Sequence, residues 1–157
     1  MGINCSVKDK DNLFSYNLWG LGDYSDTLGF NQNSSQITVS KSNEYSYNGD
    51  YSAKASVPAG VMGYLRFVPS DIQDLIGKTI TFSAYVKTAD ALKLRIYDQY
   101  GGSSYPTTVD IPSNSDGCFS VSITVNSESE GILFQLQSES SNNVRTFYTD
   151  AWSLIVQ

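Results

Sequence analysis

The stretch KTITFSAYVKT, residues 78–88, alternates apolar and polar side chains along its whole length. One face carries the apolar residues Ile80, Phe82, Ala84 and Val86. The other face carries Thr81, Ser83, Tyr85 and Lys87. A period of two is typical of a strand that buries one face and exposes the other. This segment therefore predicts an antiparallel sheet packed on one side only.

The same alternation recurs on both sides of this stretch. Seven further strands are predicted at 36–40, 51–56, 63–68, 92–97, 119–125, 132–137 and from about 145 to the end. One short helical turn, 70–76, begins at Ser70 and ends before Gly77. Many short strands separated by turns are typical of a sandwich. We predict an all-β fold: one domain, 1–157, forming a two-sheet antiparallel sandwich or jelly roll.

Composition excludes several function classes. The chain has 157 residues, a net charge of −6 and no histidine. An acidic balance argues against nucleic acid, for which a basic surface supplies most of the affinity. Without histidine, the usual general base and the commonest zinc ligand are missing. No apolar stretch is long enough to span a membrane. We therefore expect a binding protein and not an enzyme.

Two cysteines, Cys5 and Cys118, match no metal-binding spacing. One disulfide or two unpaired thiols are both compatible with their positions. We expect unpaired thiols, because nothing else in the sequence marks the pair.

The order of features resembles the jelly-roll carbohydrate-binding modules attached to xylanases, which also occur in phage tail and baseplate proteins. The resemblance rests on the segments 11–14 before Trp19, Gly49-Asp50-Tyr51-Ser52, 81–87 and Phe147–Leu154. It implies an all-β, two-sheet antiparallel jelly-roll sandwich of the galactose-binding-like type. It also implies a non-catalytic module that binds cell-surface or polysaccharide glycan. Such a module would be located outside the cell, on a cell surface or in a virion, within a larger protein or assembly. The alternative is a structural or protein-interaction sandwich of a virion or surface assembly without a sugar ligand.

Outward-facing tyrosine, arginine and glutamine side chains indicate where a glycan would bind. If the second, fourth, fifth and seventh predicted strands share a sheet, its outer face gathers Tyr85, Lys87, Arg95, Tyr97, Gln135 and Gln137. Aromatic rings stack on sugars, and amide or guanidinium groups bond hydroxyls. Trp19 and Tyr105 would lie at the rim of this site. Tyr64 and Arg66 are assigned to the other sheet and left out; the alternative is a solvated face with no ligand.

A structural calcium ion is implied by the resemblance, in which an Asp before the last strand often binds calcium. Asp150 occupies that position, and Asn48 and Asp50 lie in a turn able to supply further oxygens. Carboxylate catalysis would need two acids flanking a sugar. Among the candidates Glu128, Glu130 and Glu139, the first two lie in a Ser-rich loop, which favours a solvated turn.

Overall fold

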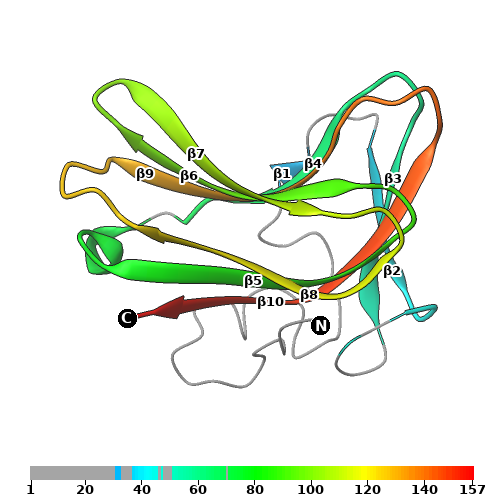
Figure 1. Cartoon of the computed structure of the whole chain (residues 1–157), viewed down its shortest axis with the longest axis horizontal. Coiled ribbons are helices and arrows are strands. Elements are labelled where there is room, and N and C mark those ends of the chain that lie inside the picture. Colours follow the sequence, from blue (N-terminus) through cyan, green and yellow to red (C-terminus); the bar gives the residue numbers. More distant parts are fainter. Residues whose placement is uncertain (1–30, 33–36, 46, 48–50, 70) are drawn as a thin grey trace.

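A computed structural model describes residues 31–32, 37–45, 47, 51–69 and 71–157. Two five-stranded antiparallel sheets form a sandwich across these residues (Figure 1). The prediction of an all-β two-sheet sandwich is confirmed. The 3-10 turn Gln73–Leu75 (η1) is the only helical element in the described part. Within these ranges, no helix reaches the length and hydropathy that crossing a membrane requires.

The first sheet, here sheet A, is the lower layer of Figure 1. Its strand order is β2-β3-β10-β5-β8. These strands span Thr38–Ser42, Ser52–Val57, Arg145–Val156, Thr79–Thr88 and Ser115–Thr124.

The second sheet, here sheet B, is the upper layer of Figure 1, and its order is β1-β4-β9-β6-β7. Its strands span Asn31–Gln32, Gly63–Phe67, Gly131–Ser138, Leu92–Tyr100 and Ser103–Ile111. The eight predicted strands are therefore present with shifted ends. The sequence analysis missed the short β1 and the long β7, and β7 places Tyr105 in a strand instead of a loop.

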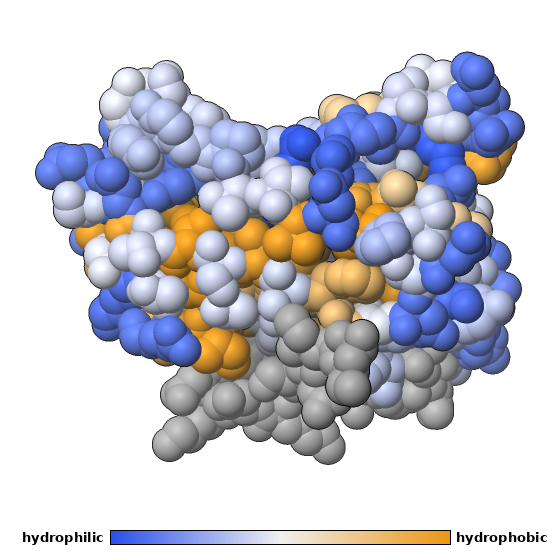
Figure 2. Space-filling view, in the orientation of Figure 1, coloured by the Kyte–Doolittle hydropathy of each residue, from blue (hydrophilic) through white to orange (hydrophobic). Residues whose placement is uncertain are grey.

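The core is built by the predicted alternation. Phe82 of β5 lies between Phe134 of β9 and Trp152 of β10, with ring centroids 5.3 and 4.9 Å apart in edge-to-face geometry. All three side chains are at most 1% exposed. Burying an aromatic side chain stabilises the fold by about 1.5–3 kcal/mol, so this contact between the sheets is a major part of the core. In Figure 2 the core is visible edge-on as a hydrophobic band between the two layers.

The last strand, β10, contains an irregularity that shapes the outer side of sheet A. Its register with β5 shifts between Asp150 and Ser153, and Ala151 adopts a positive φ of 53°. Two residues then oppose one, as in a β-bulge. The indole of Trp152 turns into the core, where it donates to Thr149 Oγ1 at 2.8 Å.

Cys118 corrects one expectation of the sequence analysis. It is disulfide-bonded, so the expectation of two unpaired thiols is wrong. The other cysteine of the chain, Cys5, lies outside the described residues. Cys118 forms a second small buried cluster with Tyr85 and Ala151, on the outer side of sheet A.

Candidate functional site: the outer face of sheet B

The register of sheet B brings three strands of polar side chains together. Tyr64 and Arg66 of β4 lie opposite Gln137 and Gln135 of β9. On the other flank of β9, Lys93 and Arg95 of β6 lie opposite the same two glutamines. Cross-strand neighbours in an antiparallel pair point to the same face. We call this surface the sheet B face, formed by Tyr64, Arg66, Lys93, Arg95, Tyr97, Gln135 and Gln137. In Figure 2 the upper surface is hydrophilic and hollowed between two raised ends.

A hydrogen-bonded chain crosses the centre of this face. Arg66 Nε donates to Gln135 Oε1 at 2.8 Å, and Gln135 Nε2 donates in turn to Gln137 Oε1. Gln137 Nε2 donates to Glu139 Oε1 at 3.0 Å. Gln135 and Gln137 are only 1% and 3% exposed although they point away from the core. Their amides are therefore fixed in orientation, since buried polar groups retain their partners.

Arg95 links Tyr97 to this series of hydrogen bonds. Its Nη1 donates to Tyr97 Oη at 3.0 Å and approaches Gln137 Oε1 at 3.4 Å. The Arg95 Nε atom is buried and has no hydrogen-bond partner among the described residues. At the other flank, the guanidinium of Arg66 lies 4.3 Å from the ring centroid of Tyr64. The face thus combines two tyrosine rings, two fixed amides and two guanidinium groups, which suits hydroxyl-rich ligands.

An edge cavity of about 520 Å³ adjoins one end of this face. It is lined by Ala91, Leu92, Lys93, Asp110, Ile111, Pro112 and Glu139. Lys93 Nζ donates to Asp110 Oδ1 at 2.9 Å across β6 and β7. Lys93 of the sheet B face and Glu139, which accepts a hydrogen bond from Gln137, both line this cavity. Polar side chains of the face therefore border the cavity.

Four of the predicted site residues lie together, and two do not. Arg95, Tyr97, Gln135 and Gln137 share the sheet B face. Tyr85 and Lys87 are on β5 in sheet A, on the opposite side of the sandwich, so the prediction of one shared face is wrong. Alternation along a strand shows which side chains point outward, but it does not show to which sheet the strand belongs.

The same error excluded two residues that the face contains. Tyr64 and Arg66 were assigned to the other sheet, whereas β4 pairs directly with β9. The alternation correctly predicted that both side chains point outward. It did not predict the strand order, which decides the sheet to which they belong.

Of the two predicted rim residues, the described one, Tyr105, does not border the face. Tyr105 is 47% exposed and lies opposite Asp98, which is buried between the sheets. It therefore points to the inner side of the β6–β7 hairpin, beyond the end of the core, where its ring stacks on Tyr100 at 4.3 Å. The prediction of Tyr105 at the rim is wrong because β7 was not recognised as a strand. Trp19 lies outside the described residues.

The predicted metal ligand Asp150 has another set of partners. It is fully buried, and its Oδ1 and Oδ2 accept the backbone N–H groups of Ala151 and Tyr47 at 2.8 and 2.9 Å. N–H donors stabilise a carboxylate without a cation. Asn48 and Asp50 lie outside the described residues. Within the described ranges, no group of three or more His, Cys, Asp or Glu residues is arranged to hold a metal. Calcium therefore stays a prediction.

The three carboxylates considered for catalysis lie in different surroundings. Glu128 is exposed, and its backbone N–H donates to Asn126 Oδ1 at 2.8 Å, which is a local turn contact. Glu130 is exposed and borders a different hollow with Tyr100 and Ser104. Glu139 alone adjoins the sheet B face, where it accepts from Gln137.

Comparison with solved structures identifies the fold. The xylan-binding CBM22-1 domain of Paenibacillus barcinonensis Xyn10C aligns with a TM-score of 0.61 at 15% identity, covering 83% of this chain and 86% of that one. A family 16 carbohydrate-binding module aligns at 0.60 and 14% identity, covering 98% and 97%. The chain has the jelly-roll fold of carbohydrate-binding modules. The predicted resemblance is thus confirmed at the level of the fold.

A phage protein carries a similar sandwich. The enzymatically active domain of tailspike protein 4 of bacteriophage CBA120 aligns with a TM-score of 0.65 at 14% identity, covering 82% of this chain and 19% of that one. No family model matches the sequence, and no curated protein matches it.

Proposed function

We propose that this domain is a non-catalytic carbohydrate-binding module that recognises an oligo- or polysaccharide through the sheet B face. The observation that carries the proposal is the fixed amide pair Gln135–Gln137, held between Arg66 and Arg95. Donors and acceptors already oriented on the protein lose little entropy when a sugar binds. Solved neighbours of this fold include a xylan-binding module, which supports a glycan as the ligand class.

The tyrosine rings of the sheet B face would supply the apolar contacts to the sugar. Tyr64 and Tyr97 lie on the two strands that flank β9, so they stand on either side of the glutamine pair. Both are partly exposed. A sugar ring stacked on either one would direct its hydroxyl groups toward the partly exposed guanidinium groups of Arg66 and Arg95, which the buried amides hold in place.

The test begins with an array of neutral and acidic oligosaccharides that includes xylo-oligosaccharides, followed by calorimetric titration of the strongest hit. We expect Tyr97→Ala to weaken binding by about 1–3 kcal/mol because it removes a stacking surface. Gln135→Ala should weaken binding by about 1 kcal/mol or more, since it removes the buried amide that fixes the orientation of Arg66 and Gln137. Tyr105→Ala is the matched control, because that ring lies on the inner side of the hairpin.

Two results would contradict the proposal. One is an array without a saturable ligand. The other is a ligand whose affinity survives Tyr64→Ala, Tyr97→Ala and Gln135→Ala combined in one protein that still folds.

The setting we propose is extracellular, on a cell surface or in a virion, as part of a larger protein or assembly. The tailspike neighbour favours a phage adhesion device, since the matching sandwich is one part of a longer chain there. The same match supports the second candidate, a structural sandwich of a virion assembly without a sugar ligand. A blank array together with self-association in size-exclusion chromatography would favour that second candidate.

The calcium prediction is tested separately. Elemental analysis of purified protein should find about one calcium per chain if the ion is structural. In that case chelation should lower the melting temperature, because a ligand that binds only the folded state stabilises it by RT ln(1 + [L]/Kd). Protein that is free of calcium and insensitive to chelation would remove the ion from the proposal.

A further inference from the structure

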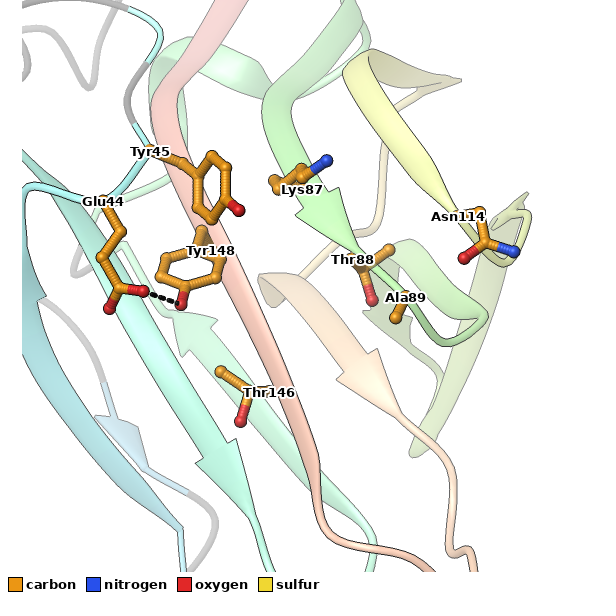
Figure 3. A pocket seen from close by; sticks show the side chains of 8 residues that line it. All are labelled: Glu44, Tyr45, Lys87, Thr88, Ala89, Asn114, Thr146 and Tyr148. Atoms are coloured by element: carbon orange, nitrogen blue, oxygen red, sulfur yellow. Dashed lines mark hydrogen bonds between the residues drawn. The ribbon is translucent and has the colours of Figure 1, made fainter.

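A second pocket lies on the opposite side of the sandwich from the sheet B face. Its volume is about 300 Å³, and it opens over β5 and β10 of sheet A. We call it the tyrosine pocket, after Tyr45 and Tyr148, which line it with Glu44, Lys87, Asn114 and Thr146. Figure 3 shows the two rings meeting above β10, with Glu44 to one side and Lys87 to the other. The sheet B face contributes none of these residues.

Two packed tyrosine rings form the aromatic wall of the pocket, and one of them is partly exposed. The rings of Tyr45 and Tyr148 meet edge to face, with centroids 4.8 Å apart. Tyr148 is 9% exposed and held by its hydroxyl, which donates to Glu44 Oε2 at 3.0 Å. Tyr45 is 42% exposed, so much of its ring is open to solvent. The fixed ring of Tyr148 therefore supports an accessible ring beside it.

The segment that carries Tyr45 is tied to the sheet at both of its sides. The backbone N–H of Glu44 donates to Ser42 Oγ at 3.1 Å, at the end of β2. The backbone N–H of Tyr47 donates to the buried carboxylate of Asp150 at 2.9 Å. Asp150 thus serves to hold this segment over β10, and Tyr45 is presented by anchored backbone.

The charges around the pocket are matched. Glu44 Oε1 accepts from Lys54 Nζ at 2.7 Å, and Lys87 Nζ lies 3.7 Å from Asp116 Oδ2. The bond from Lys54 lowers the pKa of Glu44. Burial, reinforced by the bond to Glu44, raises the pKa of Tyr148. Near neutral pH the pocket therefore presents an ionised acceptor and a protonated phenol, with no unmatched charge to select an ion.

We propose that the tyrosine pocket is a second carbohydrate site, which accepts one or two units of a neutral sugar. Tyr45 offers the face on which the C–H side of a sugar stacks. Glu44 accepts hydrogen bonds from hydroxyl groups, and the exposed amide of Asn114 with the Lys87 ammonium donates them. The volume lies at the lower limit of ligand sites, roughly 300–1,000 Å³, so it admits a short terminal unit. The two sites would let one domain contact glycan with both outer faces.

The experiment measures chemical-shift changes of the full chain during titration with methyl glycosides of xylose, glucose, galactose, mannose and N-acetylglucosamine, up to tens of millimolar. We expect at least one glycoside to give saturable shifts at Tyr45, Lys87 and Tyr148. Tyr45→Ala should weaken that binding about tenfold or more, whereas Tyr45→Phe should retain it, because the ring provides the stacking surface.

The neighbouring tyrosine supplies a matched control. Tyr47 is also 42% exposed, but its ring packs on Tyr85 and does not line the pocket. Tyr47→Ala should leave the affinity unchanged. The inference is overturned if no glycoside gives saturable shifts at the pocket, or if those shifts survive Tyr45→Ala. Either result leaves the sheet B face to be judged by its own ligand and its own variants.

Discussion

The outer faces of the two sheets differ in how their side chains are held. On sheet B, long polar side chains lie flat on the strands and bond one another, so that even Gln135 and Gln137 are nearly inaccessible. On sheet A, Tyr85 and Cys118 form a buried apolar cluster, and the accessible tyrosine lies in a segment between strands. The first face carries a connected polar network, whereas on the second a small buried cluster lies beside a pocket. Under the two proposals, recognition would depend on strand register at sheet B and on one anchored segment at sheet A.

Both faces pack on the same core, so a substitution in that core should have the largest effect on stability. Phe134→Ala should lower the free energy of unfolding by about 3–5 kcal/mol, because it removes a fully buried ring and leaves a cavity next to Phe82. Urea unfolding measures the loss. Thr108→Ala, exposed on β7, should change stability by less than about 0.5 kcal/mol. Equal effects of the two substitutions would contradict the assignment of the core.

A substitution in the hydrogen-bonded glutamine network of sheet B should have the second largest effect on stability, and it tests the difference between the two faces. Gln135→Ala should cost about 1–3 kcal/mol of stability, because it leaves Arg66 Nε and the Gln137 amide without their buried partner. This is more than an outward position would suggest, since such substitutions usually stay within about 0.5 kcal/mol. A denaturation midpoint equal to that of the wild type would mean that the face is solvated and not preorganised.

These results show what the sequence could predict and what it could not. The alternation of residues 78–88 correctly predicted the strand and its buried face, because burial on one side forces a period of two. The pairing of β4 with β9 was not predictable in this way, because it depends on which strands meet after long connections. Tyr64 and Arg66 were therefore excluded from a face to which they belong. The burial of Gln135 was also not predictable, because it depends on which strands lie on either side of β9.

Tyr85 provides a test specific to sheet A. Burial, followed by the hydrogen bond to Asp116, raises the pKa of its phenol above the ordinary value of 10.0. A raised pKa favours the protonated folded form, so this stability is fully present below pH 10 and is lost as the pH rises further. Tyr85→Phe should cost about 1 kcal/mol at neutral pH through the lost hydrogen bond. It should also reduce the fall of the melting temperature above pH 10. An unchanged alkaline profile would show that Tyr85 is accessible to solvent in both states.

The smallest expected effect concerns the ion pair at the edge of the sheet B face. Lys93 and Asp110 approach to 2.9 Å, but their side chains are 32% and 80% exposed. Water screens such a pair, so a double-mutant cycle of Lys93→Ala and Asp110→Ala should give a coupling of only about 0.2–1 kcal/mol. Because exposed charges are screened within about 3 Å at 1 M salt, the coupling should disappear there. The buried chain from Arg66 to Gln137 should keep its contribution under the same conditions, since it is shielded from solvent. A coupling at the edge that resists salt would mean that this pair belongs to the rigid network, and the preformed surface of sheet B would then extend into the edge cavity that Lys93 and Asp110 line.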